Sequence, residues 1–178
     1  AGGDRRAARD VAVIDRMGGF DIDSDGQLVV EQTQFYQDVY AFQDLVRYDP
    51  ASRRTTLLTR RERARDPALS PDGEQVAYSK NGASQSELWV MATRAPDQRR
   101  RVWRGAGRYD QVFMPAWSPD GQRLAFVAWR AGGARDVLVV DVGSGAVTPI
   151  TDDRALQDNP RWSPDGRYLY FTSDRTGV

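Results

Sequence analysis

The chain has 178 residues, of which 25 are Lys or Arg and 25 are Asp or Glu, so its formal net charge at pH 7 is zero. This balance argues against a strongly basic nucleic-acid-binding domain, and no apolar run approaches the roughly 20 residues of a membrane-spanning helix. Cysteine and histidine are both absent, which excludes disulfides, thiol chemistry and the usual general base of Ser-His-Asp catalysis.

The chain opens with residues 1–17, which lack the apolar stretch of a secretory signal. Within them, residues 10–15 read Asp-Val-Ala-Val-Ile-Asp, a pattern typical of a short β-strand. We therefore predict an N-terminal segment over residues 1–17, which holds the strand of a preceding structural unit, and a main domain over residues 18–178.

The first motif in chain order is an acidic turn, since residues 21–26 read Asp-Ile-Asp-Ser-Asp-Gly. Alternate carboxylates followed by a glycine wrap calcium in helical loops, but such loops need a Glu at their twelfth position, and Gln32 stands there. We favour a β-hairpin turn at this place. Calcium bound by Asp21, Asp23 and Asp25 stays open as the one candidate cofactor.

Aromatic residues gather in the connection that follows this turn. The connection runs 23 residues from Gly26 to Asp49, whereas the equivalent one from Gly121 to Asp141 runs 20. A longer hairpin would expose aromatic side chains to a partner, because aromatic anchors concentrate binding energy at interfaces. The alternative, which we favour, is that they fill the core between neighbouring sheets. These four aromatic residues, the candidate binding patch, are Phe35, Tyr36, Tyr40 and Phe42.

The tetrapeptide Ser-Pro-Asp-Gly occurs three times, starting at Ser70, Ser118 and Ser163, so successive copies lie 48 and 45 residues apart. The acidic turn lies one period earlier, as a degraded fourth copy. Proline, Asp and Gly in this order favour a tight turn between antiparallel strands. A period of this length is typical of four-stranded propeller blades. The sequence therefore predicts an all-β propeller with about 3.5 to 4 blades present.

Apolar residues recur at the same places around each turn, directly before it and three residues after its glycine. The same face filled in every copy is what sheets packed against their neighbours require. We interpret these residues as core and prefer packing over ligand stacking for the two tryptophans. They are Ile22, Leu69, Trp117 and Trp162 before the turns, and Val29, Val76, Leu124 and Leu169 after them.

Arginine supplies 24 of the 25 basic residues, and Lys80 is the one lysine. One cluster comprises Arg60, Arg61, Arg63 and Arg65, and a second lies within residues 99–104. We predict that both clusters lie in links between blades and pair with Asp side chains. Because no nucleic-acid-binding motif accompanies them, nucleic acid is not an expected partner.

Residues 115–121, Pro-Ala-Trp-Ser-Pro-Asp-Gly, residues 160–166, Pro-Arg-Trp-Ser-Pro-Asp-Gly, and the terminal Ser-Asp-Arg-Thr-Gly at 173–177 resemble the TolB-type propeller repeat. The resemblance covers about residues 18–178. It implies a bacterial protein located in the periplasm or secreted, and a non-catalytic propeller that binds a protein or peptide. Similar repeats also occur in prolyl-oligopeptidase-like and tricorn-like peptidases, so the alternative is a propeller that gates or docks substrate for a peptidase domain outside this chain.

A propeller of six blades at this period would need about 276 residues, so 178 residues hold fewer than four blades. We therefore expect a piece of a larger propeller, with open edges that favour self-association. We expect no enzymatic activity from the chain itself. Its 25 carboxylates leave carboxylate catalysis open, but most occupy turns or strand ends, where solvation and turn closure explain them.

Overall fold

The structure, a computed structural model, describes residues 17–37, 39–130 and 132–175. In this part of the chain every regular secondary-structure element is a β-strand, which confirms the predicted all-β class. The strand predicted at residues 10–15 lies outside the described residues.

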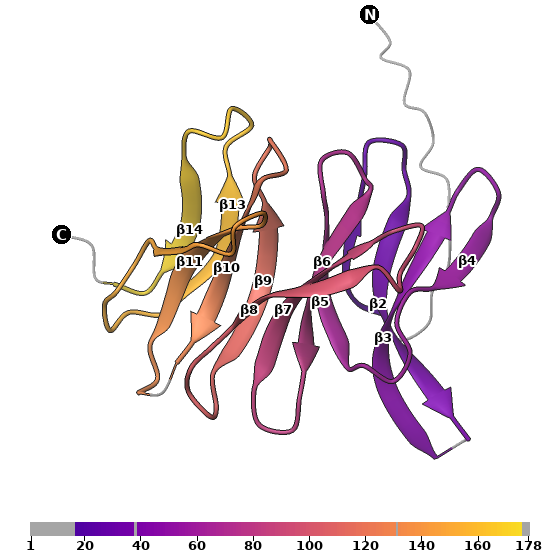
Figure 1. The fold of residues 1–178 in the computed structure, drawn as a ribbon, viewed down its shortest axis with the longest axis horizontal. Helices are drawn as coiled ribbons and strands as arrows, with labels where there is room; N and C mark the ends of the chain where they lie inside the picture. Colours follow the sequence, from indigo (N-terminus) through magenta and orange to yellow (C-terminus); the bar gives the residue numbers. More distant parts are fainter. Residues whose placement is uncertain (1–16, 38, 131, 176–178) are drawn as a thin grey trace, which may run out of the picture.

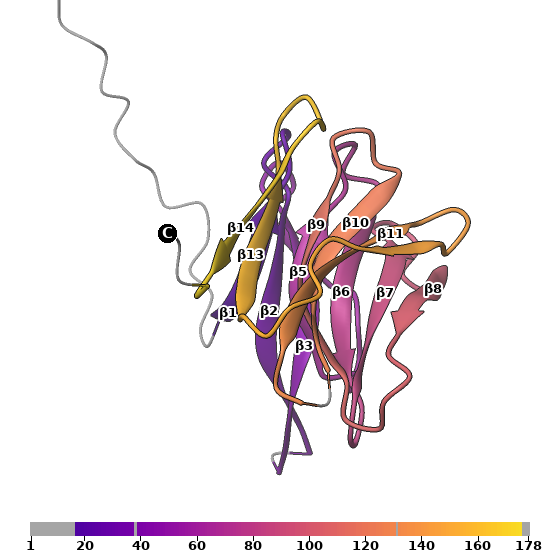
Figure 2. The same cartoon turned by 90° about the vertical axis from the view of Figure 1, so that its left-hand side faces the viewer.

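The strands form three four-stranded antiparallel sheets and one two-stranded sheet, in which neighbours in sequence pair. Figure 1 shows these sheets side by side in an open arc, and Figure 2 shows the same arc from its side. This is a partial β-propeller, as predicted.

The first sheet comprises β1 (Met17–Ile22), β2 (Leu28–Tyr36), β3 (Tyr40–Asp49) and β4 (Arg54–Leu57). The second comprises β5 (Ala64–Leu69), β6 (Gln75–Asn81), β7 (Ser86–Ala92) and β8 (Arg99–Arg104). The third comprises β9 (Gln111–Trp117), β10 (Arg123–Trp129), β11 (Arg135–Asp141) and β12 (Val147–Pro149), and the last comprises β13 (Gln157–Trp162) and β14 (Leu169–Ser173).

The first strands of the four sheets contact one another in the order β1, β5, β9 and β13. In each neighbouring pair of first strands, a side chain of one strand forms a hydrogen bond with the backbone of the other. The Leu69 N–H donates to Asp21 Oδ2 at 2.8 Å, which joins β1 to β5. The Trp117 Nε1–H donates to the Ala68 carbonyl at 3.0 Å, which joins β5 to β9. The third link has the same form, since the Trp162 Nε1–H donates to the Ala116 carbonyl at 3.1 Å.

The three Ser-Pro-Asp-Gly segments form equivalent turns between the first and second strands of their sheets, as predicted. In each turn the glycine N–H donates to the serine carbonyl, at 2.8 to 2.9 Å. Each serine hydroxyl also donates to the Asp two residues later and accepts from the backbone N–H five residues later. Gly73, Gly121 and Gly166 have φ of 68° or 69°, a left-handed conformation that glycine adopts without strain.

Replacing Ser118 with alanine should lower the free energy of unfolding by about 1 kcal/mol, because a buried hydroxyl that both donates and accepts is lost. That hydroxyl is also the main cause that holds the pKa of Asp120 below its usual value. A lowered folded-state pKa stabilises the fold above the unfolded value, about 3.9, and this contribution disappears as the pH falls through the folded value. Urea unfolding at several pH values should therefore show that the deficit shrinks below about pH 4. The control is Ser144→Ala, which removes an exposed hydroxyl from another turn and should cost less; equal losses would contradict the prediction.

Most of the predicted core residues are buried, in two clusters that lie between neighbouring sheets. The prediction is wrong for Ile22, whose side chain is 57% exposed because no described sheet lies on the outer side of β1. In the last sheet, Trp162 and Leu169 are half-buried, since that sheet packs against one described neighbour only. The Arg123 guanidinium lies 4.7 Å from the centre of the Trp162 ring and covers it in part.

Candidate functional site

The arc has two faces of different character. The Ser-Pro-Asp-Gly turns lie on one face, at the top of Figure 1. The hairpin loops β2–β3, β6–β7 and β10–β11 lie at the opposite, lower face. The aromatic patch and the first arginine cluster belong to this loop face.

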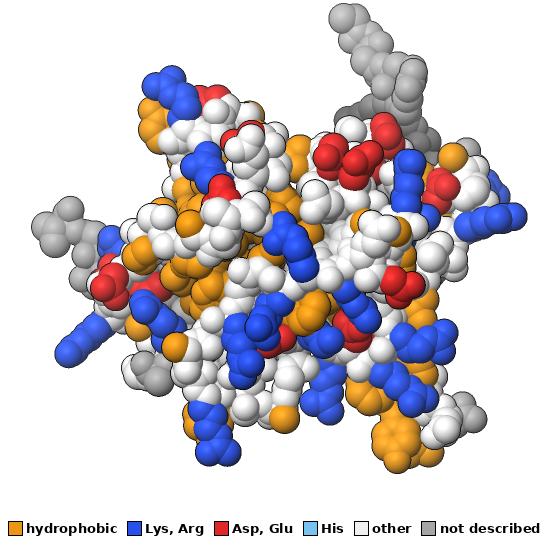
Figure 3. Space-filling view, in the orientation of Figure 1, with side chains coloured by type: hydrophobic (Ala, Val, Ile, Leu, Met, Phe, Trp, Pro, Cys, Tyr) orange, Lys and Arg blue, Asp and Glu red, His pale blue; other side chains and the backbone are white. Residues whose placement is uncertain are grey.

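The β2–β3 hairpin has nine residue pairs, whereas the β6–β7 and β10–β11 hairpins have seven each, so it extends further. Phe35 is 53% exposed and Tyr40 is 56% exposed at its tip, beside Val39, which is 75% exposed. Figure 3 shows the hydrophobic surface at the lower right, where Figure 1 places this tip. The favoured prediction of burial between blades is thus wrong for Phe35 and Tyr40, because the two additional pairs carry them beyond the neighbouring sheet.

Tyr36 and Phe42 are half-buried and lie edge-on to each other, with 5.8 Å between ring centroids. An arginine from the link between the first two sheets lies over each ring. The guanidinium carbon of Arg61 is 4.7 Å from the Tyr36 centroid, and that of Arg63 is 5.7 Å from the Phe42 centroid. Both distances are in the range of cation–π attraction. Tyr36, Phe42 and the two arginines therefore form one surface.

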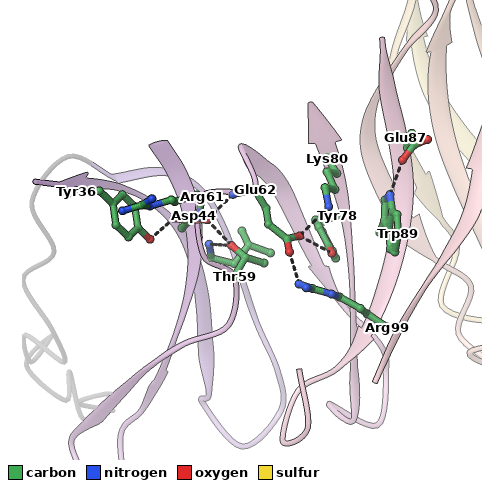
Figure 4. Close-up of polar contacts among 11 residues, drawn as sticks. Tyr36, Asp44, Thr59, Arg61, Glu62, Tyr78, Lys80, Glu87, Trp89 and Arg99 are labelled. Atoms are coloured by element: carbon green, nitrogen blue, oxygen red, sulfur yellow. Dashed lines mark hydrogen bonds and ion pairs between the residues drawn. The ribbon is translucent and has the colours of Figure 1, made fainter. Parts of the chain in front are cut away.

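A buried carboxylate, Asp44, holds this link in place (Figure 4). It is fully buried on β3, opposite Gln32 of β2. Asp44 accepts hydrogen bonds from the Thr59 hydroxyl at 2.9 Å and from the backbone N–H groups of Arg61 and Glu62 at 2.9 and 3.1 Å. The Tyr36 hydroxyl donates a further bond at 2.6 Å. Four donors satisfy the carboxylate, which makes it a structural anchor rather than a free base.

The link follows an unusual backbone path around this anchor. Arg61 and Arg63 have φ of 58° and 52°, in the left-handed region that residues other than glycine seldom adopt. Glu62, which stands between them, reaches Lys80 and Arg99 of the second sheet instead. The conformation thus places the two arginine side chains on the hairpin and the Glu62 side chain between the blades.

Glu62 binds three side chains of the second sheet, as Figure 4 shows. It forms ion pairs with Lys80 Nζ at 3.3 Å and with Arg99, and it accepts from the Tyr78 hydroxyl at 3.4 Å. Burial, followed by the charge of Glu62, raises the pKa of Tyr78 well above its usual value. Lys80 also lies 4.9 Å from the Trp89 ring centroid. All these groups have partners, so the network clamps two blades together and offers no unpaired nucleophile or base.

The two arginine clusters differ in a way that the sequence did not reveal. The second cluster is not a link but the strand β8, where Arg99, Arg101 and Arg104 pair with Glu rather than Asp. In the first cluster, Arg65 pairs with Glu31. Its other members are exposed, and no carboxylate of the described residues forms an ion pair with them. The predicted pairing is therefore wrong for Arg60, Arg61 and Arg63.

The acidic turn is a hairpin turn, in agreement with the favoured interpretation. Asp23 Oδ1 accepts from the backbone N–H groups of Asp25 and Gln27, while Asp21 accepts from the N–H groups of Ile22 and Leu69. Within the described residues, no group of three or more Asp, Glu, His or Cys side chains is arranged to hold a metal ion. Calcium binding at this turn stays a prediction.

The first strands also line a hollow of about 340 Å³ near the turn face. Backbone bulges shape it, because Asp66, Met114 and Asn159 have φ of 50° to 56° at equivalent places, each directly before a proline. The sequence signal for this hollow is the proline in the first strand of each of the last three sheets, at Pro67, Pro115 and Pro160. The lining includes Phe20, Pro67, Pro115, Trp117, Arg161 and Trp162.

No described part of the chain forms a helix long and apolar enough to cross a membrane.

Comparison with known proteins gives a consistent family. The sequence model of the family described as TolB beta propeller domain matches residues 28–178. The chain is 35% identical over 104 residues to the Tol-Pal system protein TolB of Anaeromyxobacter dehalogenans, which covers 58% of this chain and 23% of that protein. It is 32% identical over 93 residues to the uncharacterized peptidase YuxL of Bacillus subtilis, covering 49% and 14% respectively.

Among solved structures, the putative TolB of Agrobacterium tumefaciens superposes with a TM-score of 0.73 and 24% identity, over 90% of this chain and 55% of that one. At this identity the likeness concerns the fold alone. The chain spans about a quarter of the length of the curated TolB relatives that it matches.

Proposed function

The chain belongs to the TolB β-propeller domain family, and on this premise we propose that it is a non-catalytic propeller that binds a protein or peptide partner. We further propose that it works in the bacterial envelope, in the periplasm or outside the cell, by its similarity to Tol-Pal system proteins. The absence of histidine and cysteine, and the fully bonded state of the buried Asp44, support a role in binding rather than catalysis.

One observation carries the proposal, namely the exposed aromatic tip of the β2–β3 hairpin. Phe35 and Tyr40 lie on opposite faces of this ribbon, because Tyr40 pairs with Tyr36, the residue next to Phe35. Aromatic side chains lose little conformational freedom when a partner covers them, because they have only two side-chain torsion angles. The tip is therefore the surface from which we expect most of the binding energy.

Phe35→Ala with Tyr40→Ala should weaken binding of a selected peptide by tenfold or more, as expected when aromatic anchors are truncated. The peptides come from a random display library selected on the whole 178-residue chain, and their affinity is measured by calorimetry. The matched control is Val147→Ala with Ile150→Ala, two exposed residues at and just after β12, which should leave the peptide affinity unchanged. Selected peptides that bind the hairpin variant as tightly as the unchanged chain would contradict the proposed surface. Peptides cleaved by the pure chain would contradict the non-catalytic role.

A second candidate function is a propeller that gates or docks substrate for a peptidase domain of the same protein. The similarity to the uncharacterized peptidase YuxL favours it, as does the hollow lined by all four first strands. The coding sequence on both sides of these residues distinguishes the two functions. A following domain with a catalytic Ser, Asp and His favours the peptidase alternative.

A further inference from the structure

We propose that the hairpin tip together with Arg60, Arg61 and Arg63 is a docking surface for an acidic segment of a partner protein that also carries an apolar or aromatic residue. This inference rests on the proposed binding function and names the chemistry of the partner. We call this region the arginine–aromatic tip. It comprises Arg60, Arg61 and Arg63, the hairpin face with Tyr36, Tyr40 and Phe42, and the end of the hairpin with Val39 and with Phe35, which faces the other side.

The charge on this surface is uncompensated within the described residues. Arg60, Arg61 and Arg63 are exposed, and the carboxylates of Asp44 and Glu62 are engaged by groups other than these guanidinium groups. Asp44 is fully buried behind the link, and Glu62 is held by Lys80 and Arg99. Figure 3 shows basic side chains directly beside the hydrophobic surface at the tip. A chain of zero net charge thus concentrates three arginines at one apolar projection.

The arginines are positioned before any partner arrives. A guanidinium that stacks on a ring keeps the N–H groups at its edge available, and these match the two oxygens of a carboxylate. Arg61 and Arg63 stack in this way on Tyr36 and Phe42. The Arg61 N–H and the Glu62 N–H donate to Asp44, and the Arg63 carbonyl accepts from the Asn81 N–H at 3.1 Å, so the backbone of both arginines is held in place. Less side-chain entropy is then lost on binding than for a free surface arginine.

A peptide with carboxylates fits this surface better than a nucleic acid does. Binding a phosphate backbone relies on a basic patch or stripe that neutralises many phosphates, but the second arginine cluster is already paired with Glu62 and Glu87. In contrast, one peptide segment supplies both an apolar side chain for the tip and carboxylates for the arginines. We therefore expect these arginines to bind the carboxylates of a peptide rather than the phosphates of a nucleic acid.

The test compares two short synthetic peptides on the whole chain at low ionic strength. One holds a single Trp between Glu and Asp residues, and the other has Gln and Asn in their place. We expect the acidic peptide to bind about tenfold more tightly than its neutral counterpart, with a preference that falls as salt is added. Arg61→Gln with Arg63→Gln should abolish the preference, since both side chains lose their charge while the backbone bonds of the link remain, from the Arg61 N–H to Asp44 and from the Asn81 N–H to the Arg63 carbonyl. The matched control is Arg108→Gln, another arginine that lies over an aromatic ring, that of Tyr109.

The outcomes separate this inference from the proposed function. If the two peptides bind equally well, and neither binds the Phe35→Ala and Tyr40→Ala variant, the acidic preference is overturned while the proposed binding site at the hairpin stands. A preference that survives Arg61→Gln with Arg63→Gln would also overturn it. Oligothymidine tests for phosphate recognition. If it binds more tightly than the acidic peptide, and if Arg61→Gln with Arg63→Gln abolishes this binding, the surface recognises phosphate instead. Thermal melting of every variant confirms that it is folded.

Discussion

Asp44→Ala should lower the free energy of unfolding by about 3 kcal/mol, the largest loss that we expect from a single polar substitution in this chain. The Thr59 hydroxyl and the N–H groups of Arg61 and Glu62 would lose their acceptor in a buried place. Urea unfolding followed by tryptophan fluorescence measures the loss. A change below about 1 kcal/mol would show that other contacts hold the link.

The third sheet provides a second example of the same arrangement. Asp136 is 1% exposed and accepts from the Thr151 hydroxyl, which in turn accepts from the Val137 N–H, as the Thr59 hydroxyl accepts from the Leu45 N–H. Asp136→Ala should therefore also destabilise the protein. Asp49→Ala is the matched control, because Asp49 lies at the other end of β3 in an exposed turn. Only Asp44→Ala should also weaken the acidic peptide, because only it releases Arg61 and Arg63.

The repeat predicted the fold because its signal is local and periodic. Each Ser-Pro-Asp-Gly turn sets its own hydrogen bonds through residues within five positions of one another, so sequence spacing alone places it. The burial of Trp117 followed from the same periodicity. The exposure of Ile22 did not, because it depends on which sheet lies beside β1 and not on the residue or its register.

The candidate site was predictable only in part. The longer connection between β2 and β3 pointed to a hairpin extension, but whether Phe35 and Tyr40 clear the neighbouring sheet depends on contacts distant in sequence. The left-handed backbone at Arg61 and Arg63 has no sequence signal, since these positions normally favour glycine or asparagine. Their stacking on the hairpin follows from Asp44, which lies 17 residues away from Arg61 in the chain.

The open ends of the arc lead to an expectation about assembly. Phe20 and Ile22 are 58% and 57% exposed on β1, and Tyr168 and Tyr170 are 57% and 62% exposed beside and on β14. In a closed propeller a neighbouring blade would cover such side chains, because each blade buries its apolar face against the next. Among the described strands, β1 and β14 each have one edge that pairs with no other strand, and edges of this kind favour pairing with another chain. We propose that these two ends associate with each other between copies.

Sedimentation velocity across the micromolar range should accordingly show that the isolated 178-residue chain self-associates. Ile22→Ser with Tyr170→Ser should make it monomeric, since the exposed apolar area at each end is reduced by one large side chain while the buried core stays intact. Tyr109→Ser with Val147→Ser is the matched control and should leave association unchanged, because these exposed residues lie away from both ends. The Phe35→Ala and Tyr40→Ala variant identifies any contribution from the arginine–aromatic tip. A chain that is monomeric at every concentration would show that the exposed apolar residues at the two ends are too few to hold a second copy. If association is lost only in the Phe35→Ala and Tyr40→Ala variant, the contact between copies lies at the hairpin instead.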